Sequence, residues 1–409
     1  MPDTTPEAVI VAAARSPIGK AFKGSLREVR PDDLAATVVR AALDKVPELD
    51  PADLEDLLLG CGLPGGEHGF NMARVVAVLL GYDHLPGATV TRYCASSLQT
   101  TRMAFHAIRS GEGDCFLSVG CEVVSRYATG NSDGWPDTKN PLFAAAGERN
   151  ARWAAGEAPI WTDPRLAGEL PDMYTGMVET AEHVAQVAGV SRRDQDEFAA
   201  LSQQRAEKAQ ADGFFEREIV PVTVPSGDVV TRDDSPRPST TVEGISGLKP
   251  VFVGGTVTAG NACPLNDGAA ALVVMSATRA RELGITPLAR IVSTGVSGLA
   301  PEIMGLGPVE SSRRALARAG MAVGDVDLVE INEAFASQVV GSYRQLGIDV
   351  DRLNVHGGAI ALGHPFGMTG ARLLTTLVNG LRTHDQSTGL ATMCVGGGQG
   401  VAVVIERLS

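Results

Sequence analysis

The chain has 409 residues, of which 44% are hydrophobic and 20% charged, so it has ample material for the core of an α/β protein. Its net charge of −13 argues against a surface that binds nucleic acid or an anionic membrane, and an anionic ligand would need a local basic patch. The N-terminal residues predict neither a secretory signal nor a transit peptide, and no apolar run approaches membrane-spanning length. We therefore expect a cytoplasmic protein.

The cysteines are scattered along the chain. They form no CxxC pair, and no histidine stands at zinc-ligand spacing from a cysteine, so we expect no metal site. Scattered cysteines in a chain of this length are typical of a reducing compartment, which agrees with a cytoplasmic location. The six are Cys61, Cys94, Cys115, Cys121, Cys263 and Cys394.

The first quarter of the chain alternates strands with helices. Residues 8–14 are an uninterrupted apolar run, which predicts a strand buried on both faces within a parallel sheet. A helix at 33–45 and a strand at 56–60 follow, and then a helix at 71–80 and a short strand at 89–91. This alternation predicts a doubly wound α/β domain.

Cys94 opens the next predicted helix. Small residues follow it, and apolar residues recur at three- and four-residue steps from Leu98 to Ile108, before a stop at Ser110-Gly111. The first turn of a helix carries unpaired N–H groups and the positive end of the dipole, which would lower the pKa of the thiol. A lone cysteine is more often a small buried hydrophobe, so a reactive role needs support from elsewhere in the chain.

Residues 123–253 differ in character from the stretch before them. They follow a predicted strand at 114–120, and they contain two predicted helices, at 175–187 and 192–213. A connection of this length needs structure of its own, so we predict an inserted subdomain that lies over the active face. All the tryptophans of the chain fall in this insert, where they either pack it or serve the site: Trp135, Trp153 and Trp161.

The final third of the chain repeats the order of the first. A helix at 312–319 and a strand at 327–331 resemble the first helix and second strand. A later helix at 369–381 and a strand at 390–393 correspond to the Cys94 helix and the strand after it. This self-similarity predicts a duplicated architecture.

The predicted domain limits follow from this repeat. The N-terminal half comprises 1–122 plus 254–284, where a strand at 269–275 restores the α/β pattern. The insert is 123–253, and the C-terminal half is 285–409.

Three later stretches support a reactive Cys94. Asn332 stands just beyond the carboxyl end of an apolar strand, where α/β sheets hold their ligands. His364 lies among glycines and directly before a proline, which keeps it out of helical geometry. Cys394 precedes the glycine-rich residues 396–400, whose backbone N–H groups could bind an oxyanion. Each stretch alone also has a structural explanation: a helix start, a buried histidine and a turn between strands.

Taken together, these stretches resemble the thiolase family over nearly the whole chain. The motifs, in chain order, are RYCASSLQ, TAGNACPLNDGAAA, INEAFA, GGAIALGHPFGMTGAR and MCVGGGQG. The resemblance implies a five-layer αβαβα fold of duplicated halves and a homodimer or homotetramer. It also implies that coenzyme A and acyl-CoA are substrates and that no cofactor is bound permanently.

The resemblance further implies a role for each reactive residue. Cys94 would carry the acyl group, His364 would activate it, and Cys394 would act as acid or base on the second substrate. Asn332 would help to hold the oxyanion of the incoming thioester through a bound water, alongside His364. The backbone N–H groups of Cys94 and Gly396 would form a second oxyanion hole.

A further set of residues would contact coenzyme A or the acyl group. Cys263-Pro264 stands where many family members have Ser-Gly, and Gly176 stands where many biosynthetic members have a histidine. These departures leave the coenzyme A contact and the shape of the acyl pocket open. The predicted contact residues are Met177, Phe252, Ala259, Cys263, Leu265 and Phe335.

The predicted activity is acyl transfer through a cysteine acyl-enzyme. It would condense acetyl-CoA with acyl-CoA to a 3-ketoacyl-CoA, or run in reverse as CoA-dependent thiolysis, in fatty-acid β-oxidation or acetoacetyl-CoA formation. The residue types suit this chemistry, because a thiolate exchanges readily with a thioester and a histidine can move the proton.

Two alternatives remain open. A ketoacyl-synthase-type condensing enzyme would not need Cys394, and a non-catalytic acyl-CoA-binding relative would need no reactive thiols. Because Cys94 and Cys394 should converge on one substrate carbon, we also predict that they can form a reversible disulfide under oxidation.

Overall fold

A ten-stranded sheet runs through the computed structural model, which describes residues 5–129, 138–157 and 161–409. The strand order is β10-β11-β12-β9-β1-β8-β5-β3-β4, with β2 beside β8, and β6 and β7 form a separate hairpin. The strands are β1 (Ala8–Arg15), β2 (Gly19–Lys20), β3 (Asp56–Gly60), β4 (Gly87–Val90), β5 (Cys115–Val123), β6 (Val222–Thr223), β7 (Val229–Val230), β8 (Asn266–Ser276), β9 (Ala289–Gly298), β10 (Leu328–Ile331), β11 (Thr388–Val395) and β12 (Gln399–Arg407).

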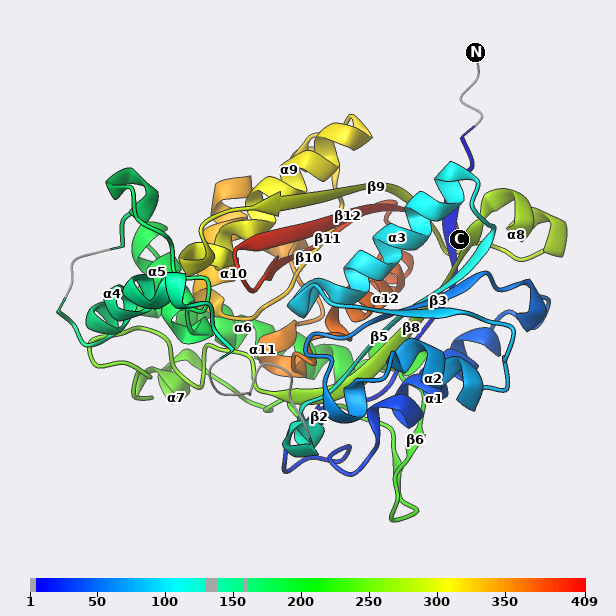
Figure 1. Cartoon of the computed structure of the whole chain (residues 1–409), viewed down its shortest axis with the longest axis horizontal. Helices are drawn as coiled ribbons and strands as arrows, with labels where there is room; N and C mark the ends of the chain where they lie inside the picture. Colours follow the sequence, from blue (N-terminus) through cyan, green and yellow to red (C-terminus); the bar gives the residue numbers. More distant parts are fainter. Residues whose placement is uncertain (1–4, 130–137, 158–160) are drawn as a thin grey trace.

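Helices cover both faces of this sheet (Figure 1). None of those in the described part of the chain combines the length and hydrophobicity needed to cross a bilayer. The helices are α1 (Pro31–Leu43), α2 (Met72–Leu79), α3 (Ser96–Ser110), α4 (Ala144–Ala154), α5 (Met177–Val187), α6 (Arg192–Ala211), α7 (Val242–Ser246), α8 (Ala277–Leu283), α9 (Gly307–Ala319), α10 (Ala336–Leu346), α11 (Ala359–Leu362) and α12 (Thr369–Thr383).

The sheet contains the same pairing pattern twice. In the first copy, β3 and β5 are parallel, β5 and β8 are antiparallel, and β8 and β1 are antiparallel. In the same way β10 pairs in parallel with β11, which pairs antiparallel with β12, which pairs antiparallel with β9. Among the described residues, strand pairing joins the two patterns through Val9 and Ile10 of β1, opposite Arg290 and Ala289 of β9. The predicted duplication is therefore confirmed.

Three hydrophobic clusters divide the molecule into five layers. Because side chains alternate along a strand, Val274 of β8 faces the central cluster with α3 and α12, and Val273 faces the outer cluster with α1 and α2. A third cluster packs α9 and α10 against the other outer face. In Figure 1, α3 and α12 lie between the strand group of β9 and β12 and that of β3, β5 and β8. This confirms the predicted αβαβα arrangement.

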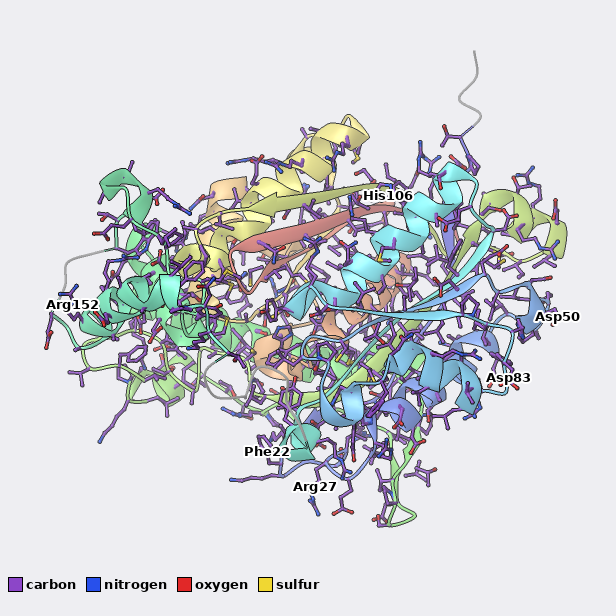
Figure 2. All side chains as sticks on the ribbon, viewed as in Figure 1. Phe22, Arg27, Asp50, Asp83, His106 and Arg152 are labelled. Atoms are coloured by element: carbon purple, nitrogen blue, oxygen red, sulfur yellow. The ribbon has the colours of Figure 1, made fainter. Side chains whose placement is uncertain are left out.

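Side chains project from both the interior and the outer elements of the fold (Figure 2). Arg27, Asp50, Asp83 and Arg152 are exposed and project away from the body of the protein. The apolar residues expected from the composition therefore form the interior. Burial of their apolar area is the main favourable contribution to folding.

The strand direction predicted for residues 8–14 was wrong. β1 is buried along its whole length, as expected, but it pairs antiparallel with both β8 and β9. Helix layers cover both faces of the sheet, so a strand at its centre is apolar throughout whichever way it runs. β9 was not predicted, because Ser293, Thr294 and Ser297 interrupt its apolar residues.

The predicted helices of the insert are confirmed as α5 and α6, and both pack against α10 of the C-terminal half. The ring centroids of Trp153 and His183 are 3.9 Å apart, and Trp161 donates a hydrogen bond to Glu302 at 3.1 Å. Both tryptophans therefore pack within the protein. Trp135 lies outside the described residues. The domain limits 1–122 plus 254–284, 123–253 and 285–409 remain predictions.

Two glycines allow α3 to approach its neighbours closely. A Cβ on Gly60 of β3 would lie 2.4 Å from the backbone of Ser96, and a Cβ on Gly370 of α12 would lie 2.3 Å from the backbone of Leu98. Both distances are far below van der Waals contact, so only glycine fits at these positions. The N-terminal turn of α3, which follows Cys94, is thereby held against both β3 and α12.

Candidate active site

Cys94 lies in a tight turn between β4 and α3. The preceding Tyr93 has φ 43°, a left-handed conformation that is rare for a bulky residue. The hydroxyl of Ser96 donates to the carbonyl oxygen of Tyr93 at 2.6 Å and accepts from the N–H of Arg92 at 2.9 Å. These bonds stabilise the turn that presents the thiol.

A cavity of about 470 Å³ opens onto Cys94. Its wall combines residues from the Cys94 turn, from the insert and from the glycine-rich loop between β11 and β12. This volume is typical of a small-molecule site. The lining residues are Gly62, Leu63, Tyr93, Cys94, Thr138, Lys139, Met173, Tyr174, Thr175, Met177, Phe366, Gly396 and Gly397.

The environment of Cys94 differs from the prediction. Burial, together with the negative charge of Glu122, raises the pKa of Cys94 to about 12, and the backbone N–H groups of Cys94 and Gly396 act in the opposite direction. The expected lowering of the pKa was wrong, because loss of water around the sulfur outweighs the helix terminus. Cys94 is therefore a thiol at neutral pH and needs a base.

His364 has the properties of that base. Its Nδ1 lies 2.7 Å from the hydroxyl of Thr369, which itself donates to the carbonyl oxygen of Pro365 at 2.7 Å. Since a hydroxyl has one proton to donate, we assign the His364 proton to Nδ1, which leaves Nε2 as a hydrogen-bond acceptor. Burial, with the nearby charge of Arg372, lowers the pKa of His364 to about 3, so the ring is neutral at pH 7.

The backbone of His364 is fixed by Asn266, which lies in the motif TAGNACPLNDGAAA. The Asn266 side chain accepts from the N–H of His364 at 3.0 Å and donates to Gly19 and Ser235 at 2.9 and 3.0 Å. The motif contained a signal for Asn266, but neither Asn266 nor Thr369 was singled out from the sequence. Both act by positioning the imidazole.

Asn332 lies beside the imidazole. Its Nδ2 is 3.3 Å from His364 Nε2, and its own backbone N–H donates to Thr392 at 3.0 Å. The side-chain Oδ1 is buried and has no hydrogen-bond partner among the described residues. An unpaired buried carbonyl is costly, so this atom is suited to bind a water or a polar group of a ligand. The neighbouring Glu333 is buried and accepts from Ser202 at 2.6 Å, which gives it a structural role.

Cys394 is fully buried and packs with Phe335 in one small hydrophobic cluster. Burial raises the pKa of Cys394 well above its usual value, and negative charge on Cys94 and Cys263 would raise it further. Cys263 adjoins the same cluster, since its N–H donates to Ala334 at 3.1 Å. All three cysteines are free thiols in this structure, and the disulfide between Cys94 and Cys394 remains a prediction.

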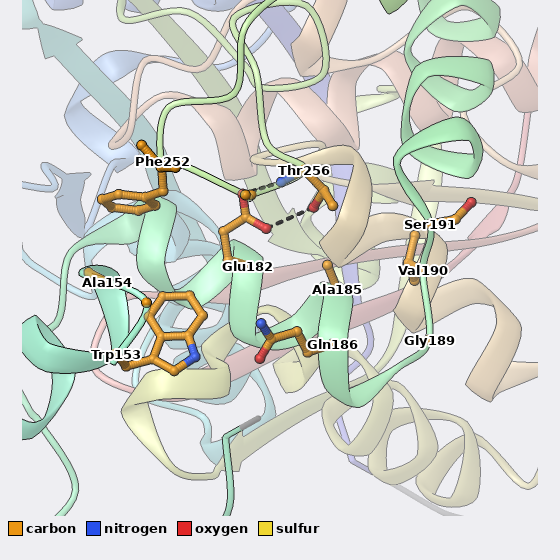
Figure 3. Close-up of a pocket in the computed structure, with 14 residues that line it drawn as sticks. Trp153, Ala154, Glu182, Ala185, Gln186, Gly189, Val190, Ser191, Phe252 and Thr256 are labelled. Carbon is orange, nitrogen blue, oxygen red and sulfur yellow. Dashed lines mark hydrogen bonds between the residues drawn. The ribbon is translucent and has the colours of Figure 1, made fainter. Parts of the chain in front are cut away.

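The other predicted contact residues are spread over a wider area. Met177 lines the cavity at Cys94. Ala259 and Leu265 are exposed outside that cavity. Phe252 instead lines a second cavity of about 500 Å³, shown in Figure 3. Their roles toward coenzyme A remain predictions.

The second cavity also contains a residue that sequence reasoning missed. The Glu182 carboxylate accepts from the backbone N–H and the hydroxyl of Thr256, each at 2.7 Å, and from the N–H of Val257 at 2.7 Å (Figure 3). Glu182 thus anchors the loop that carries Ala259. Trp153 lies on the other side, with its ring centroid 6.5 Å from that of Phe252.

The protonation states predict a flat pH profile for acylation of Cys94. His364 stays neutral above about pH 3 and Cys94 stays protonated below about pH 12, so kcat/KM for acylation should be constant between about pH 6 and 9. Rapid-mixing kinetics with a simple acyl-CoA would measure it, with circular dichroism at each pH as the folding control. A fall in kcat/KM with its midpoint near the ordinary pKa of histidine would contradict these protonation states.

The whole chain matches known sequences. A "Thiolase, N-terminal domain" matches residues 8–278 and a "Thiolase, C-terminal domain" matches 285–407. The chain is 42% identical to the 3-ketoacyl-CoA thiolase of Bacillus subtilis (strain 168), over 98% of this chain and 99% of the relative. It is 44% identical to the beta-ketoadipyl-CoA thiolase of Pseudomonas aeruginosa, with the same coverage.

The fold matches as well. The dimeric peroxisomal thiolase of Saccharomyces cerevisiae superposes with a TM-score of 0.86 at 36% identity, over 98% of this chain and 97% of that one. Sequence and fold agree along nearly the full length of the chain. The chain belongs to the thiolase family.

Proposed function

We propose that this protein is an acyltransferase that cleaves 3-ketoacyl-CoA with coenzyme A and, in reverse, condenses acetyl-CoA with acyl-CoA. The observation that carries the proposal is the proximity of two thiols, half-buried Cys94 and buried Cys394, where negative charge on Cys94 raises the pKa of Cys394; the neutral imidazole of His364 supports it. The unprotonated Nε2 of His364 lies beside Asn332, whose Oδ1 is unpaired among the described residues.

The first stage of thiolysis forms the acyl-enzyme. His364 Nε2 takes the proton of Cys94, and the sulfur attacks the 3-keto carbonyl carbon. The backbone N–H groups of Cys94 and Gly396, which point to the sulfur, stabilise the oxyanion that develops there. Collapse of this intermediate breaks the carbon–carbon bond and leaves the acyl group on Cys94 and the enolate of acetyl-CoA.

The second stage uses Cys394 as both acid and base. Its raised pKa keeps it protonated, so it can give a proton to the departing enolate, whose oxygen is held by Asn332 through a water, alongside His364. The resulting thiolate then takes the proton of incoming coenzyme A as that sulfur attacks the acyl group. His364 returns its proton to Cys94, so all protons balance.

The test is CoA-dependent thiolysis of acetoacetyl-CoA and of a longer 3-ketoacyl-CoA, followed by loss of substrate absorbance. Substrate should disappear only when coenzyme A is added. Binding of acyl-CoA by folded protein without any thiolysis would support the non-catalytic alternative. Condensation that survives loss of Cys394 would support the ketoacyl-synthase-type alternative.

The proposal also states the substrates, the need for a cofactor and the cellular location. Coenzyme A and acyl-CoA are consumed as substrates, so the reaction requires no permanently bound cofactor. The names of the relatives refer to different acyl groups. The proposed function therefore covers 3-ketoacyl-CoA in general, with no preferred chain length. A cytoplasmic location is supported by the six free cysteines.

We also propose a homodimer or homotetramer. The proposal is supported by the dimeric yeast relative and by exposed apolar side chains near the edge strand β4. Phe70 is 94% exposed, and Val78 and Leu79 at the end of α2 are also exposed, which is unusual for a surface that only meets water. Sedimentation velocity should give a mass at least twice that of the 42.6 kDa chain, and a monomer at micromolar concentration would contradict the proposal.

A further inference from the structure

One charged side chain lines the cavity at Cys94. Among the lining residues that the structure describes, Lys139 is the sole ionisable cation, and no carboxylate lines that wall. Leu63, Met173 and Phe366 make much of the remaining wall apolar. A single cation in an apolar wall is a specificity element that the proposed chemistry at Cys94 does not use.

Lys139 is exposed, and its ammonium group lies near the ring of Tyr174. The Lys139 Nζ lies 5.5 Å from the centroid of the Tyr174 ring, a cation–π contact. The hydroxyl of the same tyrosine accepts from the N–H of Asn140 at 3.0 Å, and Phe143 packs edge-on against the ring at 5.6 Å. The backbone on one side of Lys139 is therefore tied to a residue that itself lines the cavity.

Lys139 has no carboxylate within ion-pair distance in the described part of the chain. Two acidic residues, Asp172 and Glu179, border a neighbouring cavity that Lys139 also touches. Their oxygens already accept hydrogen bonds: Asp172 from the N–H of Tyr174 at 3.0 Å, and Glu179 from Asn150 at 3.0 Å and the N–H of Gly176 at 2.7 Å. Neither forms an ion pair with the ammonium group.

A bound acyl chain would displace water from this wall. Lys139 is exposed, and an alkyl chain beside it would then remove part of the water around its ammonium group with no counter-charge from the described residues, which is unfavourable. A chain that ends in a carboxylate would supply the missing charge, and its methylene groups would contact Leu63, Met173 and Phe366. Discrimination between the two chains would thus be built into a single residue.

We propose that Lys139 binds a carboxylate at the distal end of the acyl chain, so that the site takes 3-ketoacyl-CoA thioesters of dicarboxylic acids. This inference rests on the proposed thiolase activity. An anionic group at Lys139 could also be a phosphate of coenzyme A. The two sources are separable, because the phosphates are present in every acyl-CoA substrate and the distal carboxylate is not.

The test compares 3-oxoadipyl-CoA with 3-oxohexanoyl-CoA, which have six-carbon acyl chains and differ in a terminal carboxylate against a methyl group. The wild-type protein should have the higher kcat/KM for 3-oxoadipyl-CoA. Lys139→Met should lower that value by about 2- to 5-fold, the size expected for an ion pair at an exposed position. Most of the loss should be in KM, because the carboxylate is remote from the reacting carbons.

Two further variants serve as controls. Lys139→Arg keeps the positive charge and should retain the preference for 3-oxoadipyl-CoA. Lys23→Met makes the same change of charge at an exposed position outside the cavity, and it should leave both substrates unaffected. Equal activity of Lys139→Met and wild-type protein toward 3-oxoadipyl-CoA would overturn the inference.

Other outcomes separate this inference from the proposed function. An equal loss on both substrates in Lys139→Met would assign the lysine to a phosphate of coenzyme A and overturn the carboxylate proposal. Wild-type activity on 3-oxohexanoyl-CoA that exceeds that on 3-oxoadipyl-CoA would also overturn it while leaving the proposed function intact. No thiolysis of any 3-ketoacyl-CoA would overturn the proposed function and the inference together.

Discussion

Replacement of Cys94 by alanine should abolish thiolysis, with a fall in kcat of at least about 10⁴-fold, as is typical when a covalent nucleophile is removed. No other described residue can replace Cys94 as the nucleophile, because the backbone N–H groups of Cys94 and Gly396 are directed at the Cys94 sulfur. Substrate binding should change little, because the cavity wall remains in place. Steady-state thiolysis and intact-protein mass spectrometry after addition of acyl-CoA would measure both effects.

The matched control for this variant is Cys115→Ala. Cys115 is also a buried thiol with a raised pKa, but it lies in the outer cluster with α1 and α2, away from the cavity. It should retain activity and still gain the mass of one acyl group. An acyl adduct that persists in Cys94→Ala at stoichiometric amount would show that another residue is the nucleophile.

Replacement of Cys394 by alanine should separate the two stages of the reaction. Acyl transfer from a simple acyl-CoA to Cys94 needs only Cys94 and His364, so the acyl adduct should still form. Cleavage and formation of the carbon–carbon bond should fall by about 10²–10⁴-fold, the usual contribution of a general acid or base. Mass spectrometry measures the adduct, and thiolysis of acetoacetyl-CoA measures the loss.

Cys263→Ser provides the comparison for Cys394→Ala. Cys263 adjoins the same small cluster, so its replacement tests whether any change near Cys394 disturbs the reaction. It should keep both stages, and any effect of the predicted coenzyme A contact should be confined to KM. If Cys394→Ala instead loses the adduct as well, Cys394 supports Cys94 itself and the division between the stages is wrong.

Sequence patterns predicted the fold well because the patterns are local. The periodic apolar residues of α3, α5 and α12 and the continuous apolar runs of β1 and β5 are visible in single windows of sequence. Strand direction is different: it depends on which strand lies alongside, and the partners of β1 are more than 250 residues away. The prediction of a parallel β1 failed for that reason.

The motifs led to the residues proposed for catalysis, but not to their electrostatic states. The position of Cys94 before a helix indicated a lowered pKa, yet burial and Glu122 raise it. That balance depends on the packing of β5 and the insert around the sulfur. Lys139 had no sequence signal either, because a lone lysine in a loop is ordinary until the fold brings it to the wall of a cavity.

The duplication of the sheet has a consequence for how the reactive groups are distributed. Cys94 precedes α3 in one half, and His364 precedes α12, the equivalent helix of the other half. Cys394 lies at the end of β11, the counterpart of β5. The residues proposed for catalysis thus lie at corresponding places in two copies of one scaffold, and neither copy contains the whole proposed set. Turnover would therefore depend on the alignment of the two copies. A small displacement of α3 along α12 would abolish activity without unfolding the protein.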